Sequence, residues 1–361
     1  MMKNKLTILT LITAIVIIAA TVFVNLNAPQ SEKEKLPFFP ELADKIASVN
    51  HISIKGYAES INLTRKNDVW GIDEFDGYPA LPDKVKSTVL GAADLKINAP
   101  KTAIPRLYHR LGVEGPEVED TTSLLLTLED INGEKLVDVI VGKPRRSSAA
   151  QNSPGLYVRK PDDEQSYLVD GVLEITPVKT DWIERSLFDI PAEGIQSVSI
   201  KHNDGDTYKL FKSEKGQENF EFENMPAGKK IGPEILINRF GTILQDMQIS
   251  AAHSINNLEI PENASMVEIR TFDGVLISMT AFELDDIAYA TFDFSYDDNQ
   301  LLDDEEKNKA DEIRKFIEYT QQKLTGWIFE IPAFKYDIVK KRSDRVLRDN
   351  NSSVSDEEDV E

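Results

Sequence analysis

The sequence predicts an α+β protein with two tandem repeat units, each an antiparallel sheet with a packed helix, behind one N-terminal transmembrane helix. Three observations lead to this prediction. Residues 6–26 form a long apolar run without charge. Stretches of period 2 mix with stretches of helical period, without a regular strand–helix alternation. The phrase SVNHISIK at 48–55 returns, slightly altered, as IQSVSIK at 195–201.

The apolar run predicts a membrane anchor. Its 21 residues would rise about 31 Å as a helix, which is the thickness of a bilayer core. Lys3 and Lys5 precede it, so the positive-inside rule places residues 1–5 in the cytoplasm and the rest of the chain in the periplasm. A cleaved signal peptide is the alternative, but cleavage after Ala28 would put bulky Leu26 at the third position before the cut. We therefore expect a single-pass protein of the inner membrane.

Composition narrows the classes of function. The formal net charge of −21 opposes contact with a phosphate backbone, so we expect no nucleic-acid partner. The chain has no cysteine, which excludes disulfides, thiolate chemistry and zinc sites that contain cysteine. Hydrophobic residues make up 41% and charged residues 29%, as in a globular protein.

The first repeat unit is predicted at 37–190, after a polar linker at 27–36. Alternating apolar residues predict strands within 48–55, where Ile52 and Ile54 alternate with Ser53, at 61–63 and at 69–72. Pro82 suits a first helical turn, and Val85, Val89 and Ala92 follow it at helical spacing. A further strand is predicted at 95–99. Hairpins follow at 123–142, around Asn132-Gly133, and at 155–171.

The second repeat unit is predicted at 191–347 and keeps the same order. Alternation returns at 198–200 and 208–210, and a helix begins at Pro233, with Leu236, Phe240, Ile243 and Leu244 on one face. A strand at 247–251 and a hairpin around Asp273-Gly274 follow. The offset between the units grows from 146 residues (Ile54 to Ile200) to 152 residues (Leu95 to Met247), and only across turn-like segments. This pattern indicates an internal duplication, in which Trp70 and Phe220 are equivalent core anchors.

The second unit continues with a strand at 288–294 and a long helix. Asp303 and Glu306 resemble a capping box at its start, and Gly326 can end it. The side chains predicted to face the core are Ile313, Phe316, Ile317, Thr320 and Leu324. After residue 347 the chain ends in an acidic segment, 348–361, for which we predict a solvated, disordered tail.

The ordered set of motifs resembles a bacterial family known as domain of unknown function 4340. The motifs are the N-terminal anchor, VWGI followed by LPDKV, LYHRLGVEGPEV, DWIERSLFDIPAEGIQSVSI, and the closing GWIFEIPAFKYDIVKKRSDRVL. The resemblance covers residues 37–347. It implies an extracytoplasmic, membrane-tethered protein with internal repeats that accompanies ABC-type transport or gliding-motility-type systems. The family offers no established catalytic residues, so none is carried over.

No catalytic, cofactor-binding or metal-binding residue is predicted. The four histidines, His51, His109, His202 and His253, show no metal-ligand spacing. His51 and His202 lie near corresponding strand positions, where two exposed edge histidines are favoured over a shared site. The basic loop with Lys143, Arg145 and Arg146 could bind an anionic ligand, although a plain hairpin loop is the simpler interpretation.

Residues 285–306 are dense in carboxylates. They are Asp285, Asp286, Asp293, Asp297, Asp298, Asp303, Asp304, Glu305 and Glu306. They could supply oxygens for calcium, but no EF-hand loop is present, and the last of them also suit a helix start. A pair of them could also serve a hydrolase.

The expected function is that of a non-catalytic, membrane-anchored periplasmic accessory or scaffold protein of an ABC-type transport or cell-envelope assembly system. The link to transport comes from the family resemblance alone. An envelope glycan- or peptide-binding module that uses a groove between the repeats is the first alternative. A hydrolase that depends on the carboxylates of 285–306 is the second.

Overall fold

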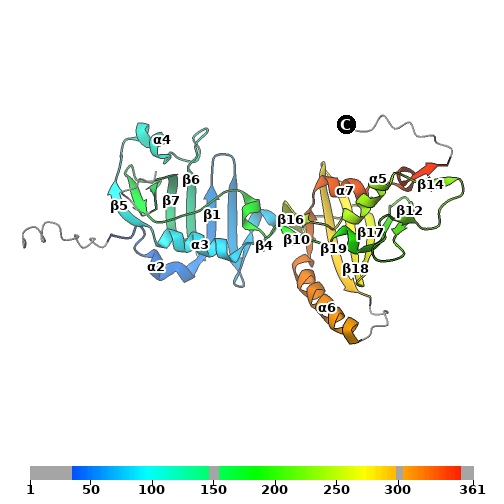
Figure 1. The fold of residues 1–361 in the computed structure, drawn as a ribbon. Coiled ribbons are helices and arrows are strands. Elements are labelled where there is room, and N and C mark those ends of the chain that lie inside the picture. Colours follow the sequence, from blue (N-terminus) through cyan, green and yellow to red (C-terminus); the bar gives the residue numbers. More distant parts are fainter. Residues whose placement is uncertain (1–34, 146–153, 298–303, 351–361) are drawn as a thin grey trace, which may run out of the picture. The chain divides into compact units, whose positions relative to one another are not determined.

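The computed structural model describes residues 35–145, 154–297 and 304–350 of the chain (Figure 1). It is a mixed α+β structure in which two large sheets, of nine and eight strands, dominate. The strand pairings within both sheets that we describe below are antiparallel. The coarse prediction of an antiparallel α+β fold is therefore confirmed.

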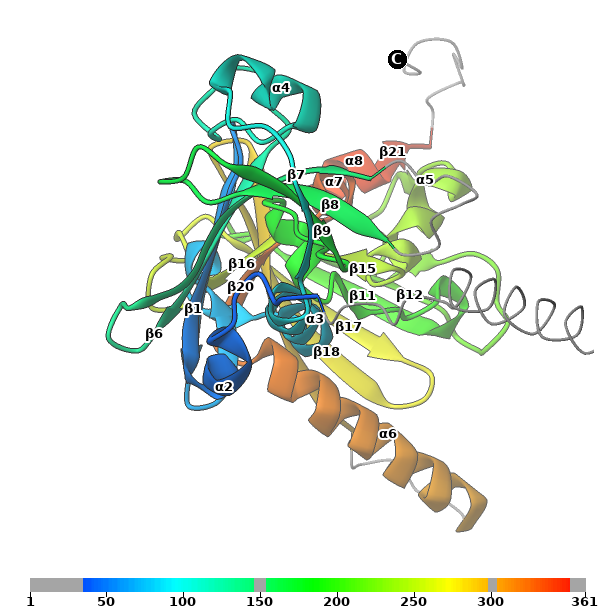
Figure 2. The same cartoon turned by 90° about the vertical axis from the view of Figure 1, so that its left-hand side faces the viewer.

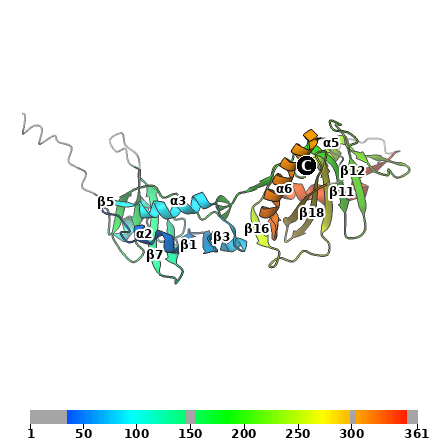
Figure 3. The same cartoon turned by 90° about the horizontal axis from the view of Figure 1, so that it is seen from below.

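The nine-stranded sheet has the order β4-β3-β2-β1-β6-β7-β8-β9-β5. Its strands are β1 Val49–Lys55, β2 Ser60–Lys66, β3 Val69–Ile72, β4 Tyr78–Pro79, β5 Lys96–Pro100, β6 Leu124–Asp130, β7 Lys135–Pro144, β8 Gly155–Arg159 and β9 Ser166–Asp170. Helix α3 (Pro82–Ala93) lies on one face of this sheet (Figures 1 and 3). The predicted core positions Val85, Val89 and Ala92 are buried, as their helical spacing indicates.

The eight-stranded sheet has the order β13-β12-β11-β17-β18-β19-β20-β16. Its strands are β11 Ile195–Lys201, β12 Thr207–Phe211, β13 Glu221–Phe222, β16 Ala251–Ser254, β17 Ser265–Thr271, β18 Val275–Leu284, β19 Ile287–Tyr296 and β20 Trp327–Glu330. Helix α6 (Asp304–Leu324) lies against β19 and extends beyond the strands (Figures 1 and 2).

Two further sheets have two strands each. They are β10 (Ser186–Phe188) with β15 (Met247–Gln248), and β14 (Lys229–Ile231) with β21 (Leu347–Asp349). The short helices are α2 Leu42–Lys45, α4 Tyr108–Leu111, α5 Glu234–Asn238, α7 Ala333–Val339 and α8 Ser343–Val346. Strand β21 extends into the segment predicted as an acidic tail, and residues 351–361 lie outside the described part of the chain.

The two sheets bury alternate side chains at matching places. In the first sheet Ile52 of β1 faces Leu63 of β2. In the second sheet Val198 of β11 faces Leu210 of β12. All four side chains are completely buried. Period-2 alternation predicted these strands correctly because a strand with one buried face places every second side chain in the core.

Contacts along the chain divide it into two compact units. The first unit consists of Met1–Val49 with Ser87–Ile175, and the second consists of Asn50–Lys86 with Thr176–Glu361. One buried cluster in the first unit contains Tyr108, Val113 and Ile140. One buried cluster in the second contains Phe282, Tyr289 and Ile328. The boundaries predicted at 37–190 and 191–347 follow the sheets and stay predictions.

Three local predictions are wrong. The helix after Pro233 is interrupted, because α5 ends at Asn238 and a 3₁₀ segment, η6 (Arg239–Thr242), follows. Phe316 of α6, predicted to face the core, is 42% exposed. Phe220 is buried as predicted, whereas its proposed equivalent Trp70 is only half-buried. Periodicity predicts which side chains share one face of an element. It does not show where a helix is interrupted or which residues cover that face.

The membrane prediction concerns residues 6–26, which lie outside the described residues. Among the helices of residues 35–145, 154–297 and 304–350, none is both long and apolar enough to cross a membrane.

Candidate functional site

The histidines are held by separate partners. Nδ1 of His51 lies 3.2 Å from the Thr64 hydroxyl within the β1–β2 pair. His109 is exposed on α4. Nε2 of His253 lies 3.1 Å from Glu330. Each of these histidines serves its own part of the fold, so the structure does not bring them together in one site.

His202 is buried, which corrects the prediction of an exposed edge histidine. Its Nδ1 lies 2.9 Å from the Ser265 hydroxyl, and its Nε2 lies 3.1 Å from the carbonyl oxygen of Lys341. Tyr208 donates to the same carbonyl at 2.6 Å. Burial, followed by the charge of Asp206, raises the pKa of Tyr208. These bonds anchor the chain near Lys341 to the sheet and give His202 a structural role.

The basic loop is used internally. Arg145 forms an ion pair with Asp170 at 3.1 Å, and its side chain is only 8% exposed. Lys143 donates to the carbonyl oxygen of His109 at 2.9 Å. Arg146 lies outside the described residues. The hypothesis of an anion-binding loop therefore loses Arg145, because its charge is already neutralised by a carboxylate.

The carboxylates of 285–306 are spread out. Asp285 and Asp286 form the left-handed turn between β18 and β19, with φ of 50° and 63°. Asp293 lies within β19 and accepts a hydrogen bond from Gln321. Asp297, just beyond β19, pairs with Arg270. Since β19 spans roughly 30 Å at about 3.3 Å per residue, the carboxylates at its two ends cannot share one cation or one scissile bond.

The described residues contain no group of three or more His, Asp or Glu side chains placed to hold a metal ion. Asp298 and Asp303 lie outside the described residues. The sequence prediction named no metal or cofactor residue.

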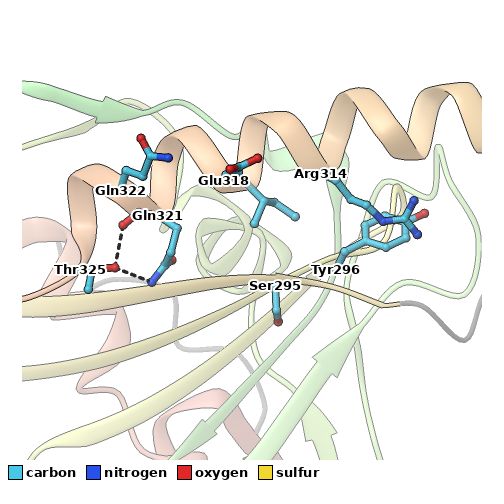
Figure 4. A pocket seen from close by; sticks show the side chains of 8 residues that line it. Ser295, Tyr296, Arg314, Glu318, Gln321, Gln322 and Thr325 are labelled. Atoms are coloured by element: carbon cyan, nitrogen blue, oxygen red, sulfur yellow. Dashed lines mark hydrogen bonds between the residues drawn. The ribbon is translucent and has the colours of Figure 1, made fainter.

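An open groove of about 540 Å³ lies between α6 and β19 in the second unit (Figure 4). Its lining residues are Ser295, Tyr296, Arg314, Ile317, Glu318, Gln321, Gln322 and Thr325. Tyr296 and Ile317 give it an apolar part, and the remaining side chains offer hydrogen-bond donors, acceptors and both charges. A groove of this chemistry suits a ligand that is itself both polar and apolar.

Gln321 fixes the helix to the strand. Its Oε1 accepts a hydrogen bond from the backbone N–H of Phe294 at 2.9 Å, and its Nε2 donates to Asp293 at 2.9 Å. Nε2 also lies 3.2 Å from the hydroxyl of Thr325. Because one side chain bonds both the backbone and a side chain of β19, the width of the groove is set at this point.

Tyr296 lines the groove, and two further aromatic side chains of α6 are exposed. The guanidinium of Arg314 lies 4.8 Å from the ring centre of Tyr296, a cation–π geometry. Phe316 packs edge-on against Phe294 at 6.4 Å and remains 42% exposed. Tyr319 is 61% exposed. Exposed aromatic side chains are a common feature of recognition surfaces.

Sequence reasoning missed this groove. The only available signal was the polar residue Gln321 beside the apolar positions of a strongly periodic helix. That signal indicates an amphipathic helix but not a groove, because Phe294 and Gln321 are brought together by the fold and not by spacing along one element.

Comparison with known proteins identifies a family but no individual relative. Neither a curated protein nor a solved structure matches the chain. The model of the family described as Domain of unknown function (DUF4340) matches residues 70–262, more than half of the 361-residue chain. The match contains Trp70 and the 3₁₀ turn at Trp182, and it ends before α6. The resemblance inferred from the motifs is thereby confirmed, and the chain belongs to the DUF4340 family.

Proposed function

We propose that the chain is a non-catalytic accessory or scaffold protein, held at the inner membrane by residues 6–26 with the remainder in the periplasm. Its task in this proposal is to hold an extended segment of a partner protein in the groove between α6 and β19. An ABC-type transport or cell-envelope assembly system is the expected setting, and this setting rests on the family resemblance.

The observation that carries the proposal is the open edge of β19 in the groove. Strand β19 pairs with β20 only at Tyr289 and Ala290. Beyond these residues α6 takes the place of a neighbouring strand, and Gln321 binds the N–H of Phe294. Since backbone N–H groups alternate in direction along a strand, those of Phe292 and Tyr296 point to the same side. An edge with backbone groups on that side is a template for strand addition.

The groove also offers side-chain contacts that an extended peptide can use. Ile317 and Tyr296 can receive apolar side chains. Arg314 and Glu318 provide opposite charges near the same wall. In strand addition, main-chain hydrogen bonds supply affinity and alternate side chains supply specificity. The groove combines both elements, which supports a protein segment as its occupant.

We also infer that the two sheets descend from one duplicated unit. When β4 is set aside, the order β3-β2-β1-β6-β7-β8-β9-β5 corresponds strand by strand to β13-β12-β11-β17-β18-β19-β20-β16. The facing pairs Ile52–Leu63 and Val198–Leu210 occupy matching places in the two ladders. A repeat of the whole order supports duplication more strongly than the similar phrases alone.

A photo-crosslinking amino acid in place of Glu318 tests the groove in native membranes. Glu318 lines the groove, and Glu312, exposed on another face of α6, is the matched control. We expect a covalent adduct with a transport or envelope-assembly protein from position 318 but not from position 312. Arg314→Glu should reduce the yield at position 318 severalfold, because it reverses one charge of the wall.

Equal adducts from both positions would contradict a specific groove. An adduct at position 318 whose yield is unchanged by Arg314→Glu would contradict the assigned contact. Folding of each variant is checked by circular dichroism before either result is interpreted.

A further inference from the structure

A second hollow, separate from the α6 groove in its chemistry, lies in the second unit and has a volume of about 330 Å³. Its aromatic walls come from two distant stretches: Trp70 and Tyr78 belong to the paired strands β3 and β4, and Trp327 lies at the start of β20. All three belong to the second compact unit. The volume lies at the lower end of the range for small-molecule sites, about 300–1,000 Å³.

The backbone near β3 and β4 is built to present these rings. A Cβ on Gly71 would lie 2.5 Å from the carbonyl oxygen of Gly77, so the strands meet only because residue 71 is glycine. Ala80 then donates its N–H to the carbonyl oxygen of Trp70 at 2.8 Å. The positions of Trp70 and Tyr78 are thus fixed by main-chain geometry and not by flexible loops.

The rings form two walls at a right angle. Tyr78 and Trp327 meet with their ring centres 5.0 Å apart and their planes at 87°. Tyr78 is 6% exposed, whereas Trp70 and Trp327, which also line the hollow, are half-buried. Packed aromatic rings with partly free faces are poised to contact the C–H groups of a flat ligand, because the ring face is electron-rich.

Side chains that donate hydrogen bonds and side chains that accept them complete the lining. Asp68 and Glu184 offer acceptors, Gln322 offers both donor and acceptor, and Lys323 offers a donor. Burial, followed by the charge of Glu184, raises the pKa of Tyr78 to about 12, so its hydroxyl remains protonated at neutral pH. A cationic ligand would meet Lys323, and an anionic ligand would meet both Asp68 and Glu184. A neutral ligand with hydroxyl groups avoids both repulsions and can use the donors and the acceptors.

We propose that this hollow is a carbohydrate site that binds one neutral hexopyranose ring, such as the terminal residue of a glycan. A pyranose has an apolar face of C–H groups and a rim of hydroxyls, which matches aromatic walls with mixed donors and acceptors. The site shares Gln322 with the α6 groove, but the proposal for that groove rests on Glu318, Arg314 and Tyr296, which take no part in this hollow.

Intrinsic fluorescence gives a direct test. The chain has three tryptophans; Trp70 and Trp327 line the hollow, and Trp182 is completely buried with its indole N–H bonded to Thr176. The full chain, in a detergent without a sugar headgroup, is titrated with N,N′-diacetylchitobiose and with cellobiose. We expect a saturable change in tryptophan emission with at least one of these two disaccharides.

Two variants assign the change to the hollow. Glu184→Gln should weaken binding severalfold to about tenfold, since a hydrogen bond to a charged group contributes more than one between neutral groups and the exposure of Glu184 reduces that contribution. Trp70→Phe should reduce both the affinity and the size of the signal. Glu174→Gln, at an exposed position outside the hollow, should bind like the unaltered chain.

A titration with choline, a cation that favours aromatic walls, provides the opposing outcome. The proposal is overturned if neither disaccharide gives a saturable change, if choline binds more tightly than both, or if Glu184→Gln and Trp70→Phe both bind as the unaltered chain does.

Discussion

The two large sheets follow the same strand order but differ in how their last hairpin is closed. In the nine-stranded sheet, β8 and β9 are joined by the short turn 160–165. In the eight-stranded sheet, the corresponding β19 and β20 are separated by residues 297–326, which include α6. Both hollows described above use residues of α6: Glu318 in the groove and Lys323 in the aromatic hollow. In the function proposed above, the shared strands supply the framework and the added helix supplies recognition.

The helices that cover the sheets differ in a second way. Helix α3 is continuous over Pro82–Ala93, whereas its counterpart breaks into α5 and the 3₁₀ segment η6. At this break the buried Lys335 donates to the carbonyl oxygens of Thr242 and Gln245, both at 2.5 Å. Burial lowers the pKa of Lys335. The second helix is therefore shorter, but the segment that follows it is held by hydrogen bonds from Lys335 of α7.

Matched core substitutions should have the largest effect. Leu63 and Leu210 occupy corresponding positions on β2 and β12, and both are completely buried. Leu63→Ala and Leu210→Ala should each lower the free energy of unfolding by about 2–5 kcal/mol, through lost burial and the cavity left behind. Chemical denaturation measures this.

The control for the core substitutions is Ile131→Ala, because Ile131 is 79% exposed. It should change the free energy of unfolding by less than about 0.5 kcal/mol. A loss from only one of the two leucine variants would break the proposed equivalence of the sheets.

Removal of the carboxylate at the end of β9 (Asp170) or at the end of β20 (Glu330) should have the next largest effect on the free energy of unfolding. Burial alone would raise the pKa of Asp170, but hydrogen bonds from Lys35 and Asn98 and the charges of Lys35 and Arg145 hold it below its ordinary value. The pKa of Glu330 is lowered by hydrogen bonds from His253 and, to a lesser extent, from Ser250, against the effect of burial.

A carboxylate whose pKa is lowered by folding stabilises the native state at pH values above its unfolded pKa. This stabilisation is lost as the pH falls through the folded pKa. The unfolded values are near 3.8 for Asp170 and 4.5 for Glu330. Asp170→Asn should therefore cost about 1.5–3 kcal/mol at neutral pH, the range for hydrogen bonds to charged groups. Glu330→Gln should cost less, since among the described residues Glu330 pairs with His253, whereas Asp170 pairs with both Lys35 and Arg145.

Unfolding curves at pH 7 and in steps from pH 5 to pH 3 measure both effects. Each variant should lose less stability than the unaltered chain over the acid range, because it lacks one carboxylate that must be protonated. Parallel pH profiles for all three proteins would show that neither carboxylate contributes in this way.

The smallest expected effect is a gain in stability. Thr88 of α3 is completely buried, and its hydroxyl has no hydrogen-bond partner among the described residues. Thr88→Val removes this polar group at almost constant volume and should raise the free energy of unfolding by about 1 kcal/mol. A thermal melt with Ser123→Ala as the comparison distinguishes the two kinds of hydroxyl, since Ser123 is hydrogen-bonded to Thr121 and should lose stability when changed.

Much of the framework could be predicted from the sequence because local signals specify it. The turns at Asn132-Gly133 and Asp273-Gly274 lie where positive φ is needed, with Gly133 at 80° and Gly274 at 86°. The alternation at Ile52 and Ile54 gave the buried face of β1. These features depend on neighbours in sequence, so periodicity and turn chemistry were sufficient.

The hollows could not be predicted because they depend on distant contacts. Trp70 lies two residues before buried Ile72, so the alternation predicts that both side chains are buried on the same face of β3. Trp70 is nevertheless only half-buried, because it lines a cavity. The groove exists because β20 begins at Trp327 and pairs with β19 at Tyr289 and Ala290. Farther along β19, the N–H of Phe294 is bonded by Gln321 of α6 and not by a neighbouring strand. Strand ends and coverage by other elements follow from the packed chain and leave no periodic trace.

The central claim, that the added helix of the second sheet carries recognition, is tested most directly by hydrogen–deuterium exchange. The full chain is measured in native membranes and again after purification. The comparison follows β19 with α6 against β8, the corresponding strand of the first sheet. We predict that exchange in β19 and α6 is slower in native membranes, whereas exchange in β8 is the same in both states. Equal exchange in all these segments, or slower exchange in β8 alone, would contradict the account.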